Sequence, residues 1–282
     1  MKNERRSKIW RGIRYKLPAA PYILWMALFV VIPIILIVVY AFTNARGEFT
    51  LANFSHMSDY TIVFVRSISL AFIATVICLI IGYPVAYVLS RSGPVFKRIA
   101  MMAVMLPMWI NFLLRTYAWM SILENTGLLN RALALFGLPG INIINTQAAV
   151  VLGMVYNYLP FMILPIFSVI VKIDGSVIEA AQDLGADSIR VFRKIILPLS
   201  LSGIISGVTM VFVPSVSTFI ISKLLGGGTN MLLGDLIEMQ FLGSAYNPHL
   251  GSAISLIMMI IVIICMSVMN RFGEGEEQAV MF

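Results

Sequence analysis

Long apolar stretches recur along the chain, and shorter polar segments separate them. Stretches of about 20 apolar residues have the length that an α-helix needs to cross roughly 30 Å of hydrocarbon. They predict six membrane-spanning helices, at about 19–42, 67–90, 99–120, 147–172, 195–222 and 250–270. The alternating segments of a membrane β-barrel do not occur in the sequence, so we expect an all-α integral membrane protein.

Polar segments define the rest of the predicted organisation. The domain of six helices covers residues 19–272 and follows a basic arm at 1–18. A polar loop at 173–194 separates the fourth helix from the fifth, and it carries both acidic and basic residues. Residues 273–282 contain three glutamates, and we expect a short disordered cytoplasmic tail there.

The composition agrees with a membrane protein and excludes a soluble domain. Hydrophobic residues make up 60% of the chain and charged residues only 12%, which leaves too few polar side chains to cover a water-facing surface. The net charge is +7, and the basic excess is concentrated in the arm between Lys2 and Lys16. Anionic lipid headgroups attract such an arm, so the charge does not indicate nucleic-acid binding.

Lysine and arginine lie mostly on one side of the predicted helices. If the N-terminus is inside, then the basic arm, the stretch from Arg91 to Arg98, the loop at 173–194 and Arg271 all fall on the inner side. The outer segments keep fewer basic residues. By the positive-inside rule, both termini and the polar loop are expected in the cytoplasm.

The chain carries no sequence pattern for nucleotide or metal binding of its own. Its densest glycine cluster, Gly226 to Gly228, is followed by Thr229 and lacks the lysine of a phosphate-binding loop. The two histidines, His56 and His249, lie near the ends of spans, where loop or packing roles are typical. We therefore expect neither a cofactor nor a metal in this chain.

The loop between the fourth and fifth helices has the pattern of two short helices. Ile178, Ala181 and Leu184 recur at a spacing of three, which places them on one face of a first helix. Gly185 then allows a sharp turn, and Asp187 begins a second helix that ends in basic residues. Such a pair of helices lies either on the lipid headgroups or against a partner protein.

A motif in this loop resembles the coupling motif of bacterial ABC-importer permeases. It reads Glu-Ala-Ala, three residues, Gly, nine residues and Ile-x-Leu-Pro, and it is matched at Glu179, Ala180, Ala181, Gly185, Ile195, Leu197 and Pro198. In that family the two short helices dock on a separate ATPase subunit. The resemblance implies that ATP-driven closure of an ATPase pair swings the membrane helices between inward-open and outward-open states.

Three further stretches resemble the first permease subunit of spermidine/putrescine ABC importers: Leu106 to Asn130, Tyr158 to Gly185 and Leu224 to Leu242. With the overall spacing, this resemblance covers nearly the whole chain. It implies a type I, MetI-like permease of the bacterial cytoplasmic (inner) membrane that transports polyamines and is not an enzyme. The implied partners are the lipid bilayer, a second homologous permease, two ATPase subunits that bind ATP and Mg, and an extracytoplasmic polyamine-binding protein.

Other substrates and other mechanisms are the alternatives. Close relatives of such permeases carry other small solutes, so an opine or an amino-acid derivative is an alternative cargo. An ion-driven secondary transporter would need an intramembrane carboxylate or an inverted repeat. A membrane-embedded enzyme would need a convergent catalytic cluster within a span. None of these features is evident in the sequence.

No acidic residue can be placed at the midplane of a predicted span, so we expect weak binding of the substrate. The candidate contacts are then aromatic and amide groups on the third and fourth spans, because aromatic faces attract ammonium groups. They are Trp109, Asn111, Tyr117, Trp119, Tyr156, Asn157 and Tyr158. The alternative interpretation is that the aromatic residues anchor helix ends at the membrane interface.

Asp235 and Glu238 are the acidic candidates. They lie three residues apart in an apolar segment, so they share one face if that segment forms a short helix in the outer leaflet. A solvated face of an outer loop is the alternative interpretation. Arg115 is a candidate partner for Asp235, Glu238 or Glu124, and such a pair would form an outer gate.

Overall fold

The first predicted span is helical in the structure, a computed structural model that describes residues 20–243 and 245–277. It comprises α2 (Ala20–Met26) and α3 (Ile32–Ala41), joined by a π-helical turn. Nearly all of its described side chains are exposed and apolar, which is the surface expected of a helix in contact with lipid. The basic arm at 1–18 lies outside the described residues.

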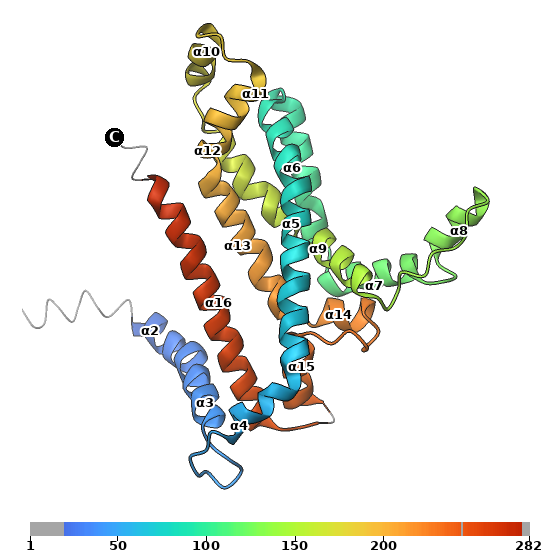
Figure 1. Ribbon diagram of the computed structural model, residues 1–282, viewed down its shortest axis with the longest axis vertical. Coiled ribbons are helices and arrows are strands. Elements are labelled where there is room, and N and C mark those ends of the chain that lie inside the picture. The colour runs from blue at the N-terminus through green and yellow to red at the C-terminus, as the bar shows by residue number, and fades with distance from the viewer. Residues whose placement is uncertain (1–19, 244, 278–282) are drawn as a thin grey trace, which may run out of the picture.

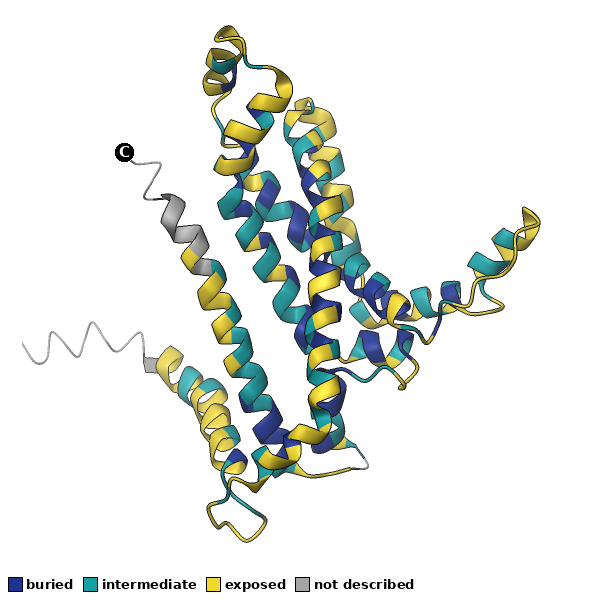
Figure 2. Ribbon diagram, in the orientation of Figure 1, coloured by how far each residue is buried: buried dark blue, intermediate teal, exposed yellow. Residues whose placement is uncertain are grey.

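Three helices form the centre of the molecule: α5 (Thr61–Arg91), α9 (Gln147–Ile170) and α13 (Leu201–Ser217). They pack against one another and run along the long axis of the molecule (Figure 1). The main hydrophobic cluster lies among them, and Figure 2 shows that buried residues are concentrated on these helices. The second and fourth predicted spans are therefore helices, although α5 begins earlier than expected.

A second hydrophobic cluster connects the first and last helices to the rest of the bundle. α3 packs against α16 (Pro248–Glu277), and α16 also contacts α15 (Leu233–Leu242) and α13. Ala41, Leu236 and Ile254 are fully buried in this cluster. The segment that follows α3 contains the short α4 (Ala52–Ser55), which also packs on α16.

The third predicted span is not one helix. α6 (Pro94–Trp109) and α7 (Phe112–Leu123) are separated by a bend of 92°. Ile110 and Asn111 are extended, and the Asn111 side chain accepts hydrogen bonds from two backbone amides of α7, at 2.9 and 3.4 Å. The prediction of one helix over 99–120 is wrong because this asparagine caps a new helix, whereas the apolar pattern continues through the bend.

The fifth predicted span is also interrupted. A bend of 61° lies at Ser200, between α12 (Leu197–Leu199) and α13. α13 then ends at Ser217, before the predicted limit of 222, and a separate short helix, α14 (Ile220–Leu225), follows. The apolar run passes through both breaks, so hydrophobicity alone could not locate them.

Two chain segments differ from the expected lengths. α16 continues to Glu277, so the expected end of the sixth span near 270 and the disordered tail are wrong for residues 273–277. Residues 278–282 lie outside the described part of the chain. After α7, the short α8 (Leu128–Leu135) extends away from the bundle and is largely exposed (Figures 1 and 2).

Candidate functional site

The loop between α9 and α12 projects from one end of the bundle (Figure 1). It contains α10 (Gly175–Asp183) and α11 (Ser188–Val191), so the prediction of two short helices joined at Gly185 is confirmed. Gly185 makes the turn at a φ of +80°, which residues with a Cβ rarely adopt. Its amide donates to the Gln182 carbonyl at 2.9 Å, which closes the C-terminus of α10.

Aspartate side chains begin both helices. The Asp174 carboxylate accepts a hydrogen bond from the Ser176 amide at 3.0 Å, and the Asp187 carboxylate accepts one from the Arg190 amide at 3.0 Å. Hydrogen bonds from Ser176 hold the pKa of the Asp174 carboxyl below its ordinary value. These caps give the loop a defined conformation of its own.

One face of the loop is anchored to the bundle. Ile178 of α10 and Val191 of α11 are buried in the main hydrophobic cluster. The ring of Phe192 packs edge-on against Tyr83 and Tyr87 of α5, with centroid distances of 5.7 and 5.5 Å. Packed aromatic side chains therefore connect the loop directly to α5.

The other face of the loop is open. Leu184 and Ile189 are 89% and 67% exposed, and Glu179 and Ala180 are exposed beside them in the sequence. Large apolar side chains exposed on a segment outside the bundle are typical of a surface that binds another molecule. The open face combines these apolar groups with charge, as a protein-docking surface does.

Leu184 departs from the expected pattern. Ile178 is buried and Ala181 is partly buried, but Leu184 does not share their packed face. The reason is that α10 ends at Asp183 and the chain turns at Gly185, so the helical spacing no longer applies to Leu184.

The last residues of the sequence motif connect the loop to the bundle. Ile195 packs against the main cluster, while Leu197 and Pro198 begin α12. α12 continues directly from a π-helical turn at Phe192–Ile196, so Pro198 lies near the C-terminal end of a longer helical segment. The hydroxyl oxygens of Ser200, at the bend that follows, and Tyr83 of α5 lie 2.8 Å apart.

The bend between α6 and α7 gathers a cation and several aromatic rings. Arg115 is only 9% exposed, and its guanidinium donates a hydrogen bond to the Pro107 carbonyl near the end of α6. It also lies over the rings of Phe112 and Tyr156, 5.9 and 5.8 Å from their centroids. Trp119 meets Tyr156 edge-on at 5.1 Å. The structure thus brings together two of the predicted pathway residues, Trp119 and Tyr156, and the predicted gate residue Arg115.

Three other candidates from the third span have different environments. Trp109 is 84% exposed at the end of α6, and Tyr117 is exposed on α7. Asn111 is exposed as well, but its side chain is engaged as the N-cap of α7. The capping of α7 therefore gives Asn111 a structural role.

The last two of the aromatic and amide candidates, Asn157 and Tyr158, are buried on α9. The Asn157 side-chain amide donates to the Gly153 carbonyl at 2.8 Å, and its side-chain oxygen has no hydrogen-bond partner among the described residues. The Tyr158 hydroxyl donates to the Pro214 carbonyl of α13 at 3.4 Å. Both side chains contribute to helix packing in this structure.

The two acidic candidates on α15 have separate partners. Asp235 is buried, and its carboxylate accepts a hydrogen bond from the Leu232 amide at 2.8 Å, which caps the helix. Glu238 is half-buried and pairs with Lys223 at 2.9 Å. Burial raises the pKa of the Asp235 carboxyl above its ordinary value, against the opposing hydrogen bonds from Ser222 and Leu232.

The predicted outer-gate pair does not form in this structure. Across residues 20–243 and 245–277, Arg115 makes no ion pair with Asp235, Glu238 or Glu124. Its guanidinium is instead held at a backbone carbonyl and over two aromatic rings.

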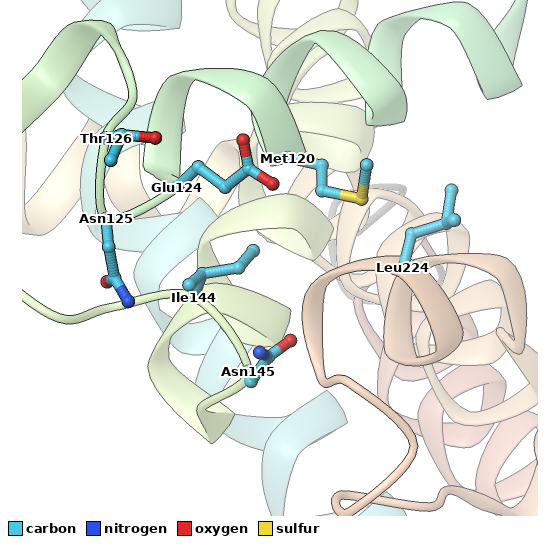
Figure 3. A pocket seen from close by; sticks show the side chains of 7 residues that line it. All are labelled: Met120, Glu124, Asn125, Thr126, Ile144, Asn145 and Leu224. Carbon is cyan, nitrogen blue, oxygen red and sulfur yellow. The ribbon is translucent and has the colours of Figure 1, made fainter.

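Sequence reasoning missed a polar pocket of about 370 Å³ at the N-terminal end of α9 (Figure 3). Its lining residues are Met120, Glu124, Asn125, Thr126, Ile144, Asn145 and Leu224. The projecting loop follows the opposite, C-terminal end of α9. These residues come from three separate parts of the chain, so no local motif marks the pocket. The contacts of Tyr83, Tyr87 and Phe192 were missed for the same reason.

Residues 79–274 match the family model of the binding-protein-dependent transport system inner membrane component. The chain belongs to this family. It is therefore a multi-pass membrane subunit of a transport system and not an enzyme, and the predicted all-α permease fold is confirmed.

Two curated relatives match this permease over most of its length. The spermidine/putrescine transport system permease protein PotB of Haemophilus influenzae is 37% identical over 269 residues, covering 92% of this chain and 94% of the relative. The protein of the same name from Escherichia coli K12 is 36% identical over 248 residues, covering 84% and 90%.

Solved structures share the fold. A bacterial ABC transporter involved in the import of the acidic polysaccharide alginate contains a chain that matches with a TM-score of 0.81 at 15% identity, covering 95% of this permease and 98% of that chain. The MetNI methionine ABC transporter in an inward-facing conformation gives a TM-score of 0.58 at 18% identity, covering 76% and 94%. At such identities the likeness concerns the architecture alone.

Proposed function

We propose that this permease carries polyamines, spermidine and putrescine, as one membrane subunit of an ATP-driven importer. The observation that carries the proposal is the similarity to two PotB permeases over at least 84% of this chain. The similarity includes the transport domain from residue 79 onward that defines the family.

The loop with α10 and α11 is the proposed docking surface for an ATPase subunit, which binds ATP and Mg. Its open face, with Leu184 and Ile189, would be covered by the ATPase. Its anchored face would pass the movement of the ATPase to α5 through Phe192 and to α13 through Ser200. The motif residues then divide into a docking part, near Glu179 and Ala180, and a transmitting part that enters the bundle.

The proposed assembly has two ATPase subunits, a second homologous permease and an extracytoplasmic polyamine-binding protein in the bacterial cytoplasmic membrane. The translocation path would lie between the two permeases, where the exposed elbow of α6 and α7 supplies contacts. Trp109 and Tyr117 are the better path residues, because their exposed rings are open to an ammonium group. The Tyr156 ring already faces Arg115.

The proposed orientation places the docking loop in the cytoplasm. The described basic residues Lys172, Arg193 and Lys194 are exposed at that end of the bundle, in agreement with the positive-inside rule. Both termini would then be cytoplasmic as well.

An importer for another small solute, such as an opine or an amino-acid derivative, is the alternative. The test is ATP-dependent uptake of labelled spermidine and putrescine into vesicles that contain this permease with its co-purifying partners. Uptake that requires ATP and fails in a Glu179→Arg variant supports the polyamine cargo and the docking loop. ATP hydrolysis by an intact complex without polyamine uptake would keep the importer and reject the cargo.

A further inference from the structure

We propose that the pocket at the N-terminal end of α9 binds a primary ammonium group of the cargo, with Glu124 as its charged contact. This site rests on the proposed polyamine function and adds a place where the cargo first meets this permease. In the proposed orientation the pocket lies on the extracytoplasmic side, because the docking loop follows the other end of α9.

The lining of the pocket matches an alkylammonium chain. Glu124, Asn125, Thr126 and Asn145 offer a carboxylate, two amides and a hydroxyl, while Met120, Ile144 and Leu224 offer apolar surface. Figure 3 shows these side chains arranged around one space, with Glu124 and Met120 on the same side. An ammonium group would bind the oxygen atoms, and the adjacent methylene groups would contact the apolar side chains.

The charge of Glu124 is not neutralised by an ion pair in the described part of the chain. Two cations lie close in sequence to the lining residues, but each has another partner. The Arg131 guanidinium donates to the Thr126 carbonyl at 3.0 Å, and the Lys223 ammonium pairs with Glu238 at 2.9 Å. Glu124 is exposed, so its carboxylate is accessible to a cationic ligand.

The segment that carries Glu124 is held in place. The Asn130 side-chain amide donates to the carbonyls of Glu124, Asn125 and Ile141, at 3.3, 3.1 and 3.0 Å. Its oxygen also accepts a hydrogen bond from the Ile141 amide at 2.7 Å. This one side chain therefore connects the two chain segments that flank α8.

The opposite wall is fixed by other hydrogen bonds. Asn145 has a φ of +65°, its amide donates to the Leu225 carbonyl at 2.8 Å, and its carbonyl accepts from the Asn230 side chain at 3.0 Å. A Cβ on Gly227 would lie 2.3 Å from the Asn145 side-chain oxygen, so that glycine provides the room for Asn145. The pocket is thus formed before a ligand binds, which reduces the entropy lost on binding.

The test uses protection of a cysteine placed in the pocket. Thr126→Cys is introduced with Cys78→Ala and Cys265→Ala, and the full complex in liposomes is labelled with a neutral maleimide. We expect spermidine to slow labelling in a concentration-dependent manner, and an exposed ion pair with Glu124 to lower the half-protecting concentration by about two- to fivefold. Adding Glu124→Gln should raise the half-protecting concentration by that factor, whereas Glu48→Gln, the same change at another exposed position, should leave it unchanged. Choline at equal ionic strength should protect less, because its quaternary ammonium donates no N–H hydrogen bond.

Uptake by the Thr126→Cys parent separates the two hypotheses. If the parent takes up spermidine but shows no protection, or if Glu124→Gln leaves the half-protecting concentration unchanged, the pocket assignment is overturned and the polyamine function stands. If the parent and the native complex hydrolyse ATP but take up no polyamine, the proposed cargo fails and the ammonium site fails with it.

Discussion

At the scale of single residues, backbone conformation separates two glycines of the docking loop. Neither Gly175 nor Gly185 has a neighbouring atom within 4 Å of the position that a Cβ would take. Only Gly185 has a positive φ, at +80°. A side chain therefore strains Gly185 through the backbone alone, without any steric clash with a neighbouring element.

This difference predicts the behaviour of a matched pair of variants. Gly185→Val is expected to disfavour the turn by about 1–2 kcal/mol and to lower polyamine uptake more than ATP hydrolysis by the complex. Gly175→Val should leave both rates near the native values. The measurement is uptake and ATPase activity at equal membrane abundance, and equal effects of the two variants would contradict the role of the turn.

Asp235 illustrates the difference between a buried acid and a pathway acid. Its carboxylate caps α15, and an asparagine side chain at this position would keep an oxygen for the Leu232 amide while removing the buried charge. Because burial raises its pKa in the folded protein, the folded state binds more protons between the ordinary and the raised pKa. The stability that the protonated Asp235 carboxyl gives to the folded state is therefore lost as the pH rises through that interval.

Asp235→Asn should accordingly keep native uptake and should remove this decline in thermal stability with rising pH. Asp235→Ala is the control, because it loses the cap together with the charge and should melt at a lower temperature. Thermal unfolding of the purified complex across acidic to neutral pH measures both effects. Loss of uptake in a stable, assembled Asp235→Asn complex would show that the carboxylate contacts the cargo.

At the scale of secondary-structure elements, glycines set the distance between α9 and α13. A Cβ on Gly203 would lie 3.0 Å from the Pro165 carbonyl oxygen and 3.1 Å from the Ile166 Cα, both backbone atoms that cannot rotate away. Ser206 lies on the same helix but is exposed. The two positions therefore differ in the close approach of a neighbouring helix.

Gly203→Val is expected to destabilise the permease by about 1–3 kcal/mol through overpacking of α9 against α13. Ser206→Val, which adds a β-branched side chain to the exposed face, should change stability little. Thermal melting of the two variants in detergent provides the comparison. Similar melting temperatures would mean that the helices separate at Gly203 without loss of other packing.

At the scale of the whole molecule, the docking loop and the polar pocket lie at opposite ends of α9. The loop presents an open apolar face, and the pocket presents a carboxylate, two amides and a hydroxyl. Sites for an ATPase and for a cargo from outside the cell must face different compartments. The separation along one membrane-spanning helix satisfies this requirement.

Labelling in intact cells tests the arrangement. With Cys78→Ala and Cys265→Ala as background, Thr126→Cys should react with a membrane-impermeant maleimide added outside the cells. Leu184→Cys should react only after the membrane is permeabilised, because the docking loop is expected in the cytoplasm. Reaction of Leu184→Cys in sealed cells would reverse the proposed orientation.

Local sequence signals were enough to predict the helical membrane fold and the two short helices of the loop at 173–194. Apolar runs of about 20 residues leave an α-helix as the structure that satisfies its own backbone in lipid. The loop was predictable because its signals are local: acidic caps at Asp174 and Asp187 and a glycine at the turn. Local hydrogen bonds and backbone conformations can be read from neighbouring residues.

The positions where the spans bend, and the side chains that meet there, depend on contacts between distant parts of the chain. The breaks at Asn111 and Ser200 lie within apolar sequence, so hydrophobicity is the same on both sides of them. The contact of Arg115 with Tyr156 and the pocket around Glu124 and Asn145 join residues from different helices and loops. Packing between distant segments fixes these contacts, and no periodic pattern along the chain predicts which segments pack together.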